Sequence, residues 1–172
     1  MKAITLWQPW ASLLACGEKQ YETRSWETKY RGPIAIHAAK IPFSTGAYID
    51  RELHRYANAL GLKDIHSFDT LPYGRIIAIA ELVNCWHIVY HPGLDVDRAK
   101  HIPIGAELDV PRKHPDFGRY IVPTDQEMFF GNWTPGRYAW EFKNMIILNN
   151  PIPAKGMQML WNWVDKPGEG SK

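Results

Sequence analysis

The sequence predicts a mixed α+β fold that is mainly β, a small barrel with helices packed around it. Short apolar segments that alternate with polar residues or are rich in β-branched residues recur along the chain, which is typical of strands. Glycine and proline, 13 of each, mark corners between these segments. The alternation of strand and helix fades after Gly61, which argues against repeated βαβ units.

The first strand and the first helix are predicted near the amino end. Ala3–Trp7 alternates apolar and polar residues as a strand does. Pro9 fits the first turn of a helix, and Gly17 is a stop signal for that helix. The apolar face of the helix carries Trp10, Leu13 and Leu14. A polar strand over Gln20–Trp26 follows. The residues on one face of this strand are Gln20, Glu22, Arg24 and Trp26.

The middle of the chain is predicted to hold two more strands and a longer helix. After the turn Tyr30–Pro33, the segment Ile34–Ala38 is a short strand. Residues 46–60 are predicted to form a helix that ends at Gly61. Its buried stripe is Ile49, Leu53, Tyr56, Ala57 and Leu60. The apolar run 74–86 is typical of a strand buried on both faces or of a barrel strand.

The second half of the chain opens with an insert. His87–Asp125 is polar, holds several prolines and has no clear period, so we expect a functional or mobile segment. Arg137–Leu148 returns to strand, with Tyr138, Trp140 and Phe142 on one face. Residues 151–156 are expected to be irregular, and Met157–Val164 to be a short apolar helix or strand.

Length and composition limit the class of protein. The 172 residues suit a single domain over residues 1–166, with a flexible tail over 167–172. The net charge of +2 is too small for an extended surface that wraps duplex DNA, but it is compatible with the recognition of a few nucleotides. Two cysteines, Cys16 and Cys85, are expected to be buried and free. Without a signal pattern or a transmembrane run, we expect a cytoplasmic protein that does not bind membranes.

A lysine, a glutamate and an arginine near the amino end are the leading candidates for function. Lys19 follows the Gly17 turn, and Glu22 and Arg24 point the same way from their strand. Mutual attraction would keep Glu22 ionised and Arg24 oriented. Such a group can bind a flat polar ligand, or Lys19 can act as a base or nucleophile with Glu22 as its partner. The alternative is an ordinary surface ion pair.

Other residues could complete a binding site. Trp26 shares a face with Glu22 and Arg24, so it is the better stacking candidate, ahead of Trp7. Gln8 could read a base edge, and Lys40 could meet a phosphate. The remaining candidates are His37 and Arg137. Two of these candidates have a structural alternative. His37 can be a core histidine with its hydrogen bonds satisfied, and Lys40 can be a solvated lysine.

Several groups are weaker candidates. Glu81 interrupts an apolar run and is expected to have a buried partner. The histidines of the insert, His87, His91, His101 and His114, lack a convincing ligand spacing. We therefore expect no metal site and no cofactor. Because phosphate-binding glycine loops and nucleophile elbows are absent, a triphosphatase or a serine hydrolase is disfavoured.

The ordered pattern of the first forty residues resembles the ASCH domain (activating signal cointegrator homology) of the PUA-like superfamily. The resemblance rests on Gln8–Leu14, on Gly17-x-Lys19-x-x-Glu22-x-Arg24-x-Trp26, on Tyr30–Gly32 and on Ile36–Lys40. The segments 135–140 and 151–156, followed by Trp161, resemble the closing part of bacterial and phage members. This resemblance implies a PUA-like β-barrel with a cleft beside the Lys19 segment.

The resemblance also implies a role with RNA, with another single-stranded nucleic acid or with a modified nucleoside. Members of the family are described as binding modules, and a few are enzymes. One bacterial relative removes the acetyl group of 4-acetylcytidine with a lysine, a threonine and a glutamate. Lys19 matches that lysine, Glu22 stands at the threonine position, and Glu127 is a candidate for the glutamate. We therefore expect a binding domain. The alternatives are a metal-independent amidohydrolase, a ribonuclease, and a protein-interaction module.

Overall fold

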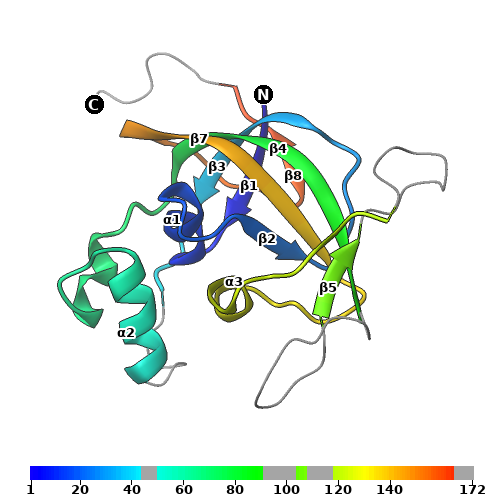
Figure 1. Ribbon diagram of the computed structural model, residues 1–172. Coiled ribbons are helices and arrows are strands. Elements are labelled where there is room, and N and C mark those ends of the chain that lie inside the picture. Colours follow the sequence, from blue (N-terminus) through cyan, green and yellow to red (C-terminus); the bar gives the residue numbers. More distant parts are fainter. Residues whose placement is uncertain (44–49, 91–103, 108–117, 165–172) are drawn as a thin grey trace. The chain divides into compact units, whose positions relative to one another are not determined.

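The computed structural model describes residues 1–43, 50–90, 104–107 and 118–164. Strands account for 40% of it and helices for 21%, so the predicted class, mainly β with helices around a barrel-like sheet, is confirmed. The chain forms two compact units, and the long strands β4 (Arg75–Tyr90) and β7 (Tyr138–Pro153) contribute to both. Figure 1 shows both strands among the labelled elements. The expected flexible tail over 167–172 and the first residues of the predicted helix, 46–49, lie outside the described residues.

Unit 1 comprises Met1–Glu18, Pro33–Glu81 and Asn144–Lys172. Its strands β4, β3 (Gly32–Ala38), β1 (Lys2–Leu6) and β8 (Leu160–Asn162) are neighbours in that order. β1 is parallel to β3 and antiparallel to β8. The sequence predicted either a helix or a strand for residues 157–164. The structure shows a strand, β8, in this segment. The core between these strands is built from Ala3, Ala35, Ile76 and Trp161.

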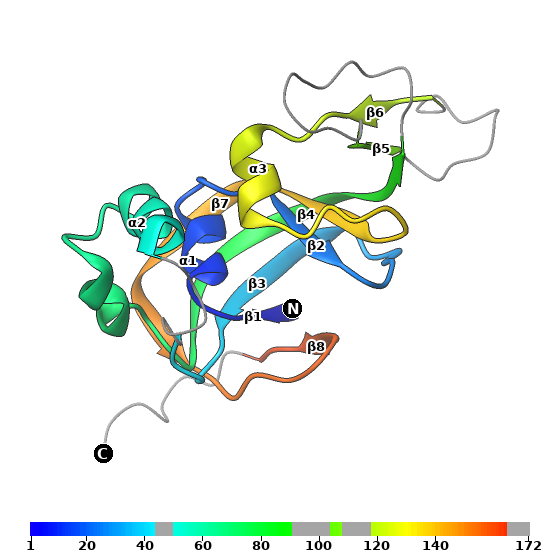
Figure 2. The same cartoon turned by 90° about the horizontal axis from the view of Figure 1, so that it is seen from below.

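In the described part of unit 1 there are also two helices and a 3₁₀ turn. α1 (Trp10–Ala15) follows β1 directly and ends before Gly17, whose φ of +85° favours glycine, as predicted. α2 (Asp50–Ala59) buries Leu53, Tyr56 and Ala57, three residues of the predicted stripe. η2 (Ile65–Thr70), which the sequence did not predict, lies beside α2 (Figure 2). Phe43 packs edge-on against Phe68 of η2, with ring centroids 4.9 Å apart.

Unit 2 comprises Lys19–Gly32 and Leu82–Lys143. In it β2 (Tyr21–Arg24) pairs antiparallel with β7, so that Glu22 faces Trp140 and Arg24 faces Tyr138. β5 (Ile104–Glu107) pairs with the end of β4 and with β6 (Tyr120–Ile121). The core of this unit contains Trp86, Ile88, Trp133 and Ala139.

The insert expected over His87–Asp125 contains strands that the sequence did not predict. β4 continues to Tyr90, and β5 and β6 lie inside the insert, because strand pairing supplied an order that the sequence period did not indicate. The short helix α3 (Asp125–Phe130) was also not predicted. β7 extends to Pro153, beyond the predicted end at residue 148.

Two expectations about buried polar or reactive groups were wrong. Glu81 is exposed and accepts a hydrogen bond from Asn144 at 2.8 Å. Glu141, a carboxylate of β7, is buried instead. Cys16 is exposed and Cys85 is half-buried, although both are free as expected. Both errors come from reading burial from neighbouring residues, whereas burial depends on which face of an element is covered.

Candidate functional site

Lys19 is a buried lysine at the entry to β2. Its side chain is 1% exposed. The ammonium group donates a hydrogen bond to the backbone carbonyl oxygen of Tyr21 and lies 3.5 Å from Oε2 of Glu22. An ionised group out of contact with water requires such partners, because burial of an unpaired charge costs about 5 kcal/mol. The contacts with Tyr21 and Glu22 therefore hold the Lys19 side chain in one position.

Glu22 links Lys19 to Arg24. Its other oxygen, Oε1, lies 3.2 Å from Nε of Arg24. The two residues share a face of β2 because side chains alternate along a strand, as the sequence predicted. The side chains of Glu22 and Arg24 are 13% and 27% exposed, so the outer end of this charged row is in reach of solvent whereas Lys19 is not.

Glu127 brings a second carboxyl group to the same row. It lies on α3, which starts where Thr124 caps the helix by accepting a hydrogen bond from the backbone N–H of Glu127 at 3.2 Å. The carboxyl group of Glu127 is buried and accepts a hydrogen bond from the backbone N–H of Gln20. Trp133 donates to the backbone carbonyl oxygen of Glu127 at 2.8 Å and so fixes the end of α3.

The electrostatics of Glu127 follow from this position. Burial raises the pKa of its carboxyl group, and the repulsion from Glu22 adds to this, against the opposing effect of the Lys19 ammonium and of the backbone N–H donors. A carboxyl group with a raised pKa beside a lysine is a recognised feature of functional sites. We name Lys19, Glu22, Arg24 and Glu127 the charged row of unit 2.

Trp26 and Arg137 lie in the same unit with other partners. The ring of Trp26 packs edge-on against Trp140, with centroids 4.5 Å apart, and its carbonyl oxygen accepts a hydrogen bond from that indole at 3.3 Å. Trp26 remains half-buried. Arg137 donates to the carbonyl oxygen of Thr23 at 3.2 Å. Both residues therefore support the β2–β7 pair.

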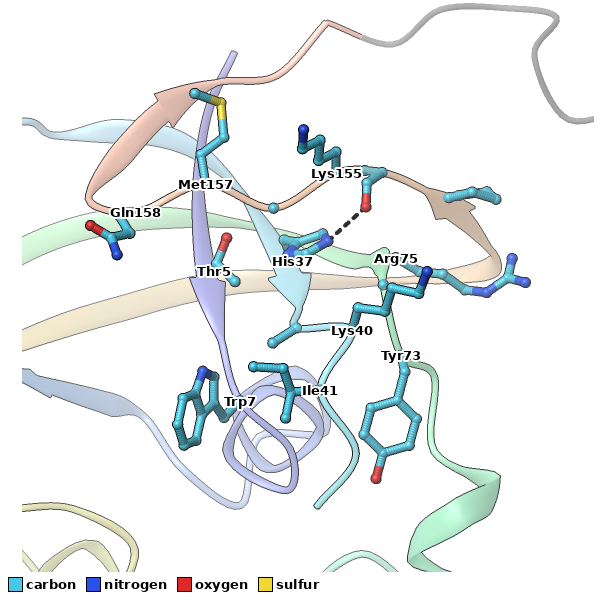
Figure 3. Close-up of a pocket in the computed structure, with 15 residues that line it drawn as sticks. Thr5, Trp7, His37, Lys40, Ile41, Tyr73, Arg75, Lys155, Met157 and Gln158 are labelled. Carbon is cyan, nitrogen blue, oxygen red and sulfur yellow. Dashed lines mark hydrogen bonds between the residues drawn. The ribbon is translucent and has the colours of Figure 1, made fainter. Parts of the chain in front are cut away.

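The other candidates belong to unit 1. Trp7, His37 and Lys40 line one pocket, shown in Figure 3. Gln8, which was expected to read a base edge, is 1% exposed. Its amide group donates to the carbonyl oxygen of Pro72 at 2.9 Å and accepts from the backbone N–H of Ser12 at 3.1 Å. These two bonds occupy Gln8 within the chain.

The sequence missed several residues of these regions. Glu127 was expected to flank a turn that could close over the cleft, and only the resemblance gave it a catalytic role, although Thr124-x-x-Glu127 has the spacing of a helix cap. Tyr73, Arg75 and Lys155 line the pocket of unit 1 and were not singled out. No local pattern marks them, because they come together from separate segments.

Within the ranges that the structure describes, no group of three or more histidine, cysteine, aspartate and glutamate side chains is arranged to hold a metal ion. None of the helices in those ranges is long and apolar enough to cross a membrane.

The fold is mainly β, and a buried lysine stands at the start of β2. Comparison with known protein families shows which family has this domain. The model of the ASCH domain matches residues 4–152, and the chain belongs to this family, which is generally related to RNA binding. Among curated proteins, human Activating signal cointegrator 1 is 36% identical over 83 residues, and its mouse counterpart is 35% identical. The match covers 48% of this chain but only 14% of each relative.

Proposed function

We propose that this chain binds RNA, another single-stranded nucleic acid or a modified nucleoside through the charged row of unit 2. The observation that carries the proposal is the row itself: a fully buried ammonium group paired with Glu22, which in turn is paired with the more exposed Arg24. The attraction within a buried ion pair rarely exceeds the free-energy cost of removing both charges from water. A buried lysine in such a row therefore indicates a functional rather than a purely structural role. Membership of the ASCH domain family supports the same conclusion.

The exposure of each group suggests its role. Lys19 is buried, so it acts as a positioning residue that fixes the orientation of Glu22. Glu22 accepts hydrogen bonds from the edge of a base, and Arg24 meets phosphate or carbonyl oxygens. Trp26 is proposed to stack on the base with the part of its ring that Trp140 leaves uncovered.

The hydrolase alternative is less favoured. An amidohydrolase would need the Lys19 amine to reach the substrate, whereas its side chain is 1% exposed and its ammonium group is bonded to Tyr21 and Glu22. Glu127 gives the alternative its one supporting observation, since a buried carboxyl group with a raised pKa can donate a proton.

Equilibrium titration of the full chain with a short single-stranded RNA and with cytidine and 4-acetylcytidine tests the proposal. Arg24→Ala is expected to weaken binding by about tenfold, the usual effect of removing a charge-assisted hydrogen bond. Lys143→Ala is the matched control, because Lys143 also pairs with a glutamate of unit 2 but is 62% exposed. Chromatography of the 4-acetylcytidine mixture detects deacetylation.

Two results would overturn the proposal. One is an affinity that neither Arg24→Ala nor Glu22→Gln changes relative to Lys143→Ala. The other is conversion of 4-acetylcytidine to cytidine that depends on Lys19, which would establish the enzyme instead. Binding that survives nuclease treatment and requires a protein partner would favour an interaction module.

A further inference from the structure

A pocket of about 910 Å³ lies within unit 1, apart from the residues of the charged row. It is lined from four segments: the end of β1, the end of β3, the residues that lead into β4, and the segment that follows β7. Figure 3 shows Trp7, His37, Lys40, Tyr73 and Arg75 around this hollow, with Lys155 on the other side of His37 from Trp7 in that view.

The lining of the pocket is electropositive. Lys40, Arg75 and Lys155 contribute three cationic side chains, and all three are exposed. Among the residues that the structure describes, neither aspartate nor glutamate lines the pocket. Arg75 donates to the carbonyl oxygen of Pro151, a residue outside the lining, at 3.3 Å, so its stem borders the pocket while its guanidinium group points away from Trp7 (Figure 3). Asp69 acts electrostatically on Tyr73 of the lining, so three cations stand against one neighbouring carboxylate, and the positive balance favours an anionic ligand.

Two aromatic side chains provide flat apolar surface next to these cations. Trp7 is 61% exposed, which is unusual for so large a ring in a folded domain. Tyr73 is fixed, because its hydroxyl group donates to the carbonyl oxygen of Phe68 at 3.0 Å and accepts from the backbone N–H of Phe43 at 3.3 Å. An exposed indole beside cations suits a ligand that carries both a ring and a charge.

One wall of the pocket is held by a close contact between His37 and Gly156. Nε2 of His37 donates to the carbonyl oxygen of Ala154 at 3.0 Å, so this nitrogen carries the proton. Burial lowers the pKa of the imidazole, which keeps it neutral near pH 7. A Cβ atom at position 156 would stand 2.4 Å from Cε1 of His37, so only glycine allows the segment with Lys155 to lie this close.

We propose that this pocket binds a nucleotide, with the phosphate at Lys40, where Arg75 adds positive charge, and the base on Trp7. The ligand class is a nucleoside 5′-monophosphate, either free or as one unit of a single-stranded chain. Lys155 supplies further positive charge on the wall that His37 and Gly156 hold in place. This proposal goes beyond the function proposed above, because all of its residues belong to unit 1.

Isothermal titration calorimetry with the full chain tests the pocket. The probes are the four nucleoside 5′-monophosphates, the corresponding nucleosides and inorganic phosphate. Monophosphates should bind more tightly than either phosphate or nucleosides, and Lys40→Ala and Arg75→Ala should each weaken that binding by about tenfold. Trp7→Ala should weaken the binding of monophosphates but leave that of phosphate unchanged.

Matched controls separate a specific site from general charge. Lys63→Ala and Arg51→Ala each remove one exposed cation of unit 1 that does not line the pocket, and they should leave affinity within about twofold of the unchanged chain. Equal losses in these controls, or no loss in Lys40→Ala and Arg75→Ala, would overturn the proposal. All of the substituted side chains are exposed, so the variants should fold.

Two further experiments are needed. One identifies the source of the nucleotide, and the other distinguishes binding in this pocket from binding at the charged row. Short single-stranded RNA with and without a 5′-phosphate is compared: dependence on that phosphate indicates a free nucleotide or chain end, and equal binding indicates phosphates inside the chain. The losses caused by Lys40→Ala and Arg75→Ala should be equally large in the Arg24→Ala background, because none of the pocket residues belongs to the charged row. If Arg24→Ala abolishes monophosphate binding while the pocket variants do not, the nucleotide binds at the charged row and this proposal is wrong.

Discussion

Replacement of Lys19 by methionine should reveal how strongly the buried ammonium group is coupled to its carboxylates. Lys19→Met keeps the length of the side chain but leaves Glu22 and Glu127 without the cation that faces them. Removal of one partner from a buried ion pair costs about 3–5 kcal/mol. Because Glu22 is 13% exposed and keeps Arg24 at 3.2 Å, we expect the lower end, about 3 kcal/mol.

Urea unfolding at 25 °C, followed by tryptophan fluorescence, measures this difference. A loss of about 3 kcal/mol should lower the midpoint by roughly 1–2 M urea and still leave a folded population, since domains of this size have about 5–15 kcal/mol of stability. Lys143→Met is the control. Lys143 lies 3.1 Å from Glu141 but is 62% exposed, so its loss should cost at most about 1 kcal/mol.

The pH dependence gives a second, independent measure. Lys19 opposes the rise of the Glu127 pKa, so its removal raises that pKa further. A carboxyl group with a raised pKa in the folded state stabilises the fold below its ordinary pKa and loses that contribution as the pH rises through the folded value. The cost of Lys19→Met should therefore be larger at pH 7 than at pH 4. Equal stability of the Lys19→Met variant and the unchanged chain at pH 7 would refute the reasoning.

Three further predictions concern single positions in the two units. Gly156→Ala should destabilise the fold by about 1–3 kcal/mol through the clash with His37, as measured by urea unfolding, and a neutral effect would show that the segment moves freely. Burial raises the pKa of Glu141, but hydrogen bonds from Asn84 and Trp86 and the contact with Lys143 outweigh it and leave that pKa lowered. Its contribution is therefore present above the ordinary glutamate pKa and lost as the pH falls through the lowered value, so Glu141→Gln should flatten the acid limb of the stability profile. Burial, together with repulsion from Glu141 and Glu127, raises the pKa of Tyr21 to about 12. Stability should then fall between the ordinary tyrosine pKa and that value, and Tyr21→Phe should show a smaller fall in alkaline unfolding experiments.

The elements that depend on local patterns could be predicted from the sequence. The strand before Trp7, the helix that ends at Gly17 and the strand that begins after Arg137 all have a clear period and a turn residue at their ends. α3 could not be predicted from its period, because six residues make fewer than two turns. Its start was nevertheless encoded in the cap at Thr124.

The candidate site was predictable to the same extent. Glu22 and Arg24 pair because they are two residues apart on a strand, which is visible in the sequence. The contact of Glu127 with Gln20 spans 107 positions, and that of His37 with Ala154 spans 117. No local pattern specifies such contacts. The sequence also selected Glu81 as the buried carboxylate, whereas the fold buries Glu141.

By itself, the sequence determined the strands and helices that have a clear period, and it placed an ammonium, a carboxylate and a guanidinium group within six residues of one another. Periodicity and turn residues act over a few positions, so they are readable without a fold. Only the tertiary structure decided that Lys19 is buried, that Glu127 joins it, and that four distant segments enclose a cationic pocket beside Trp7. Burial and the grouping of charges arise from contacts between residues far apart in the chain.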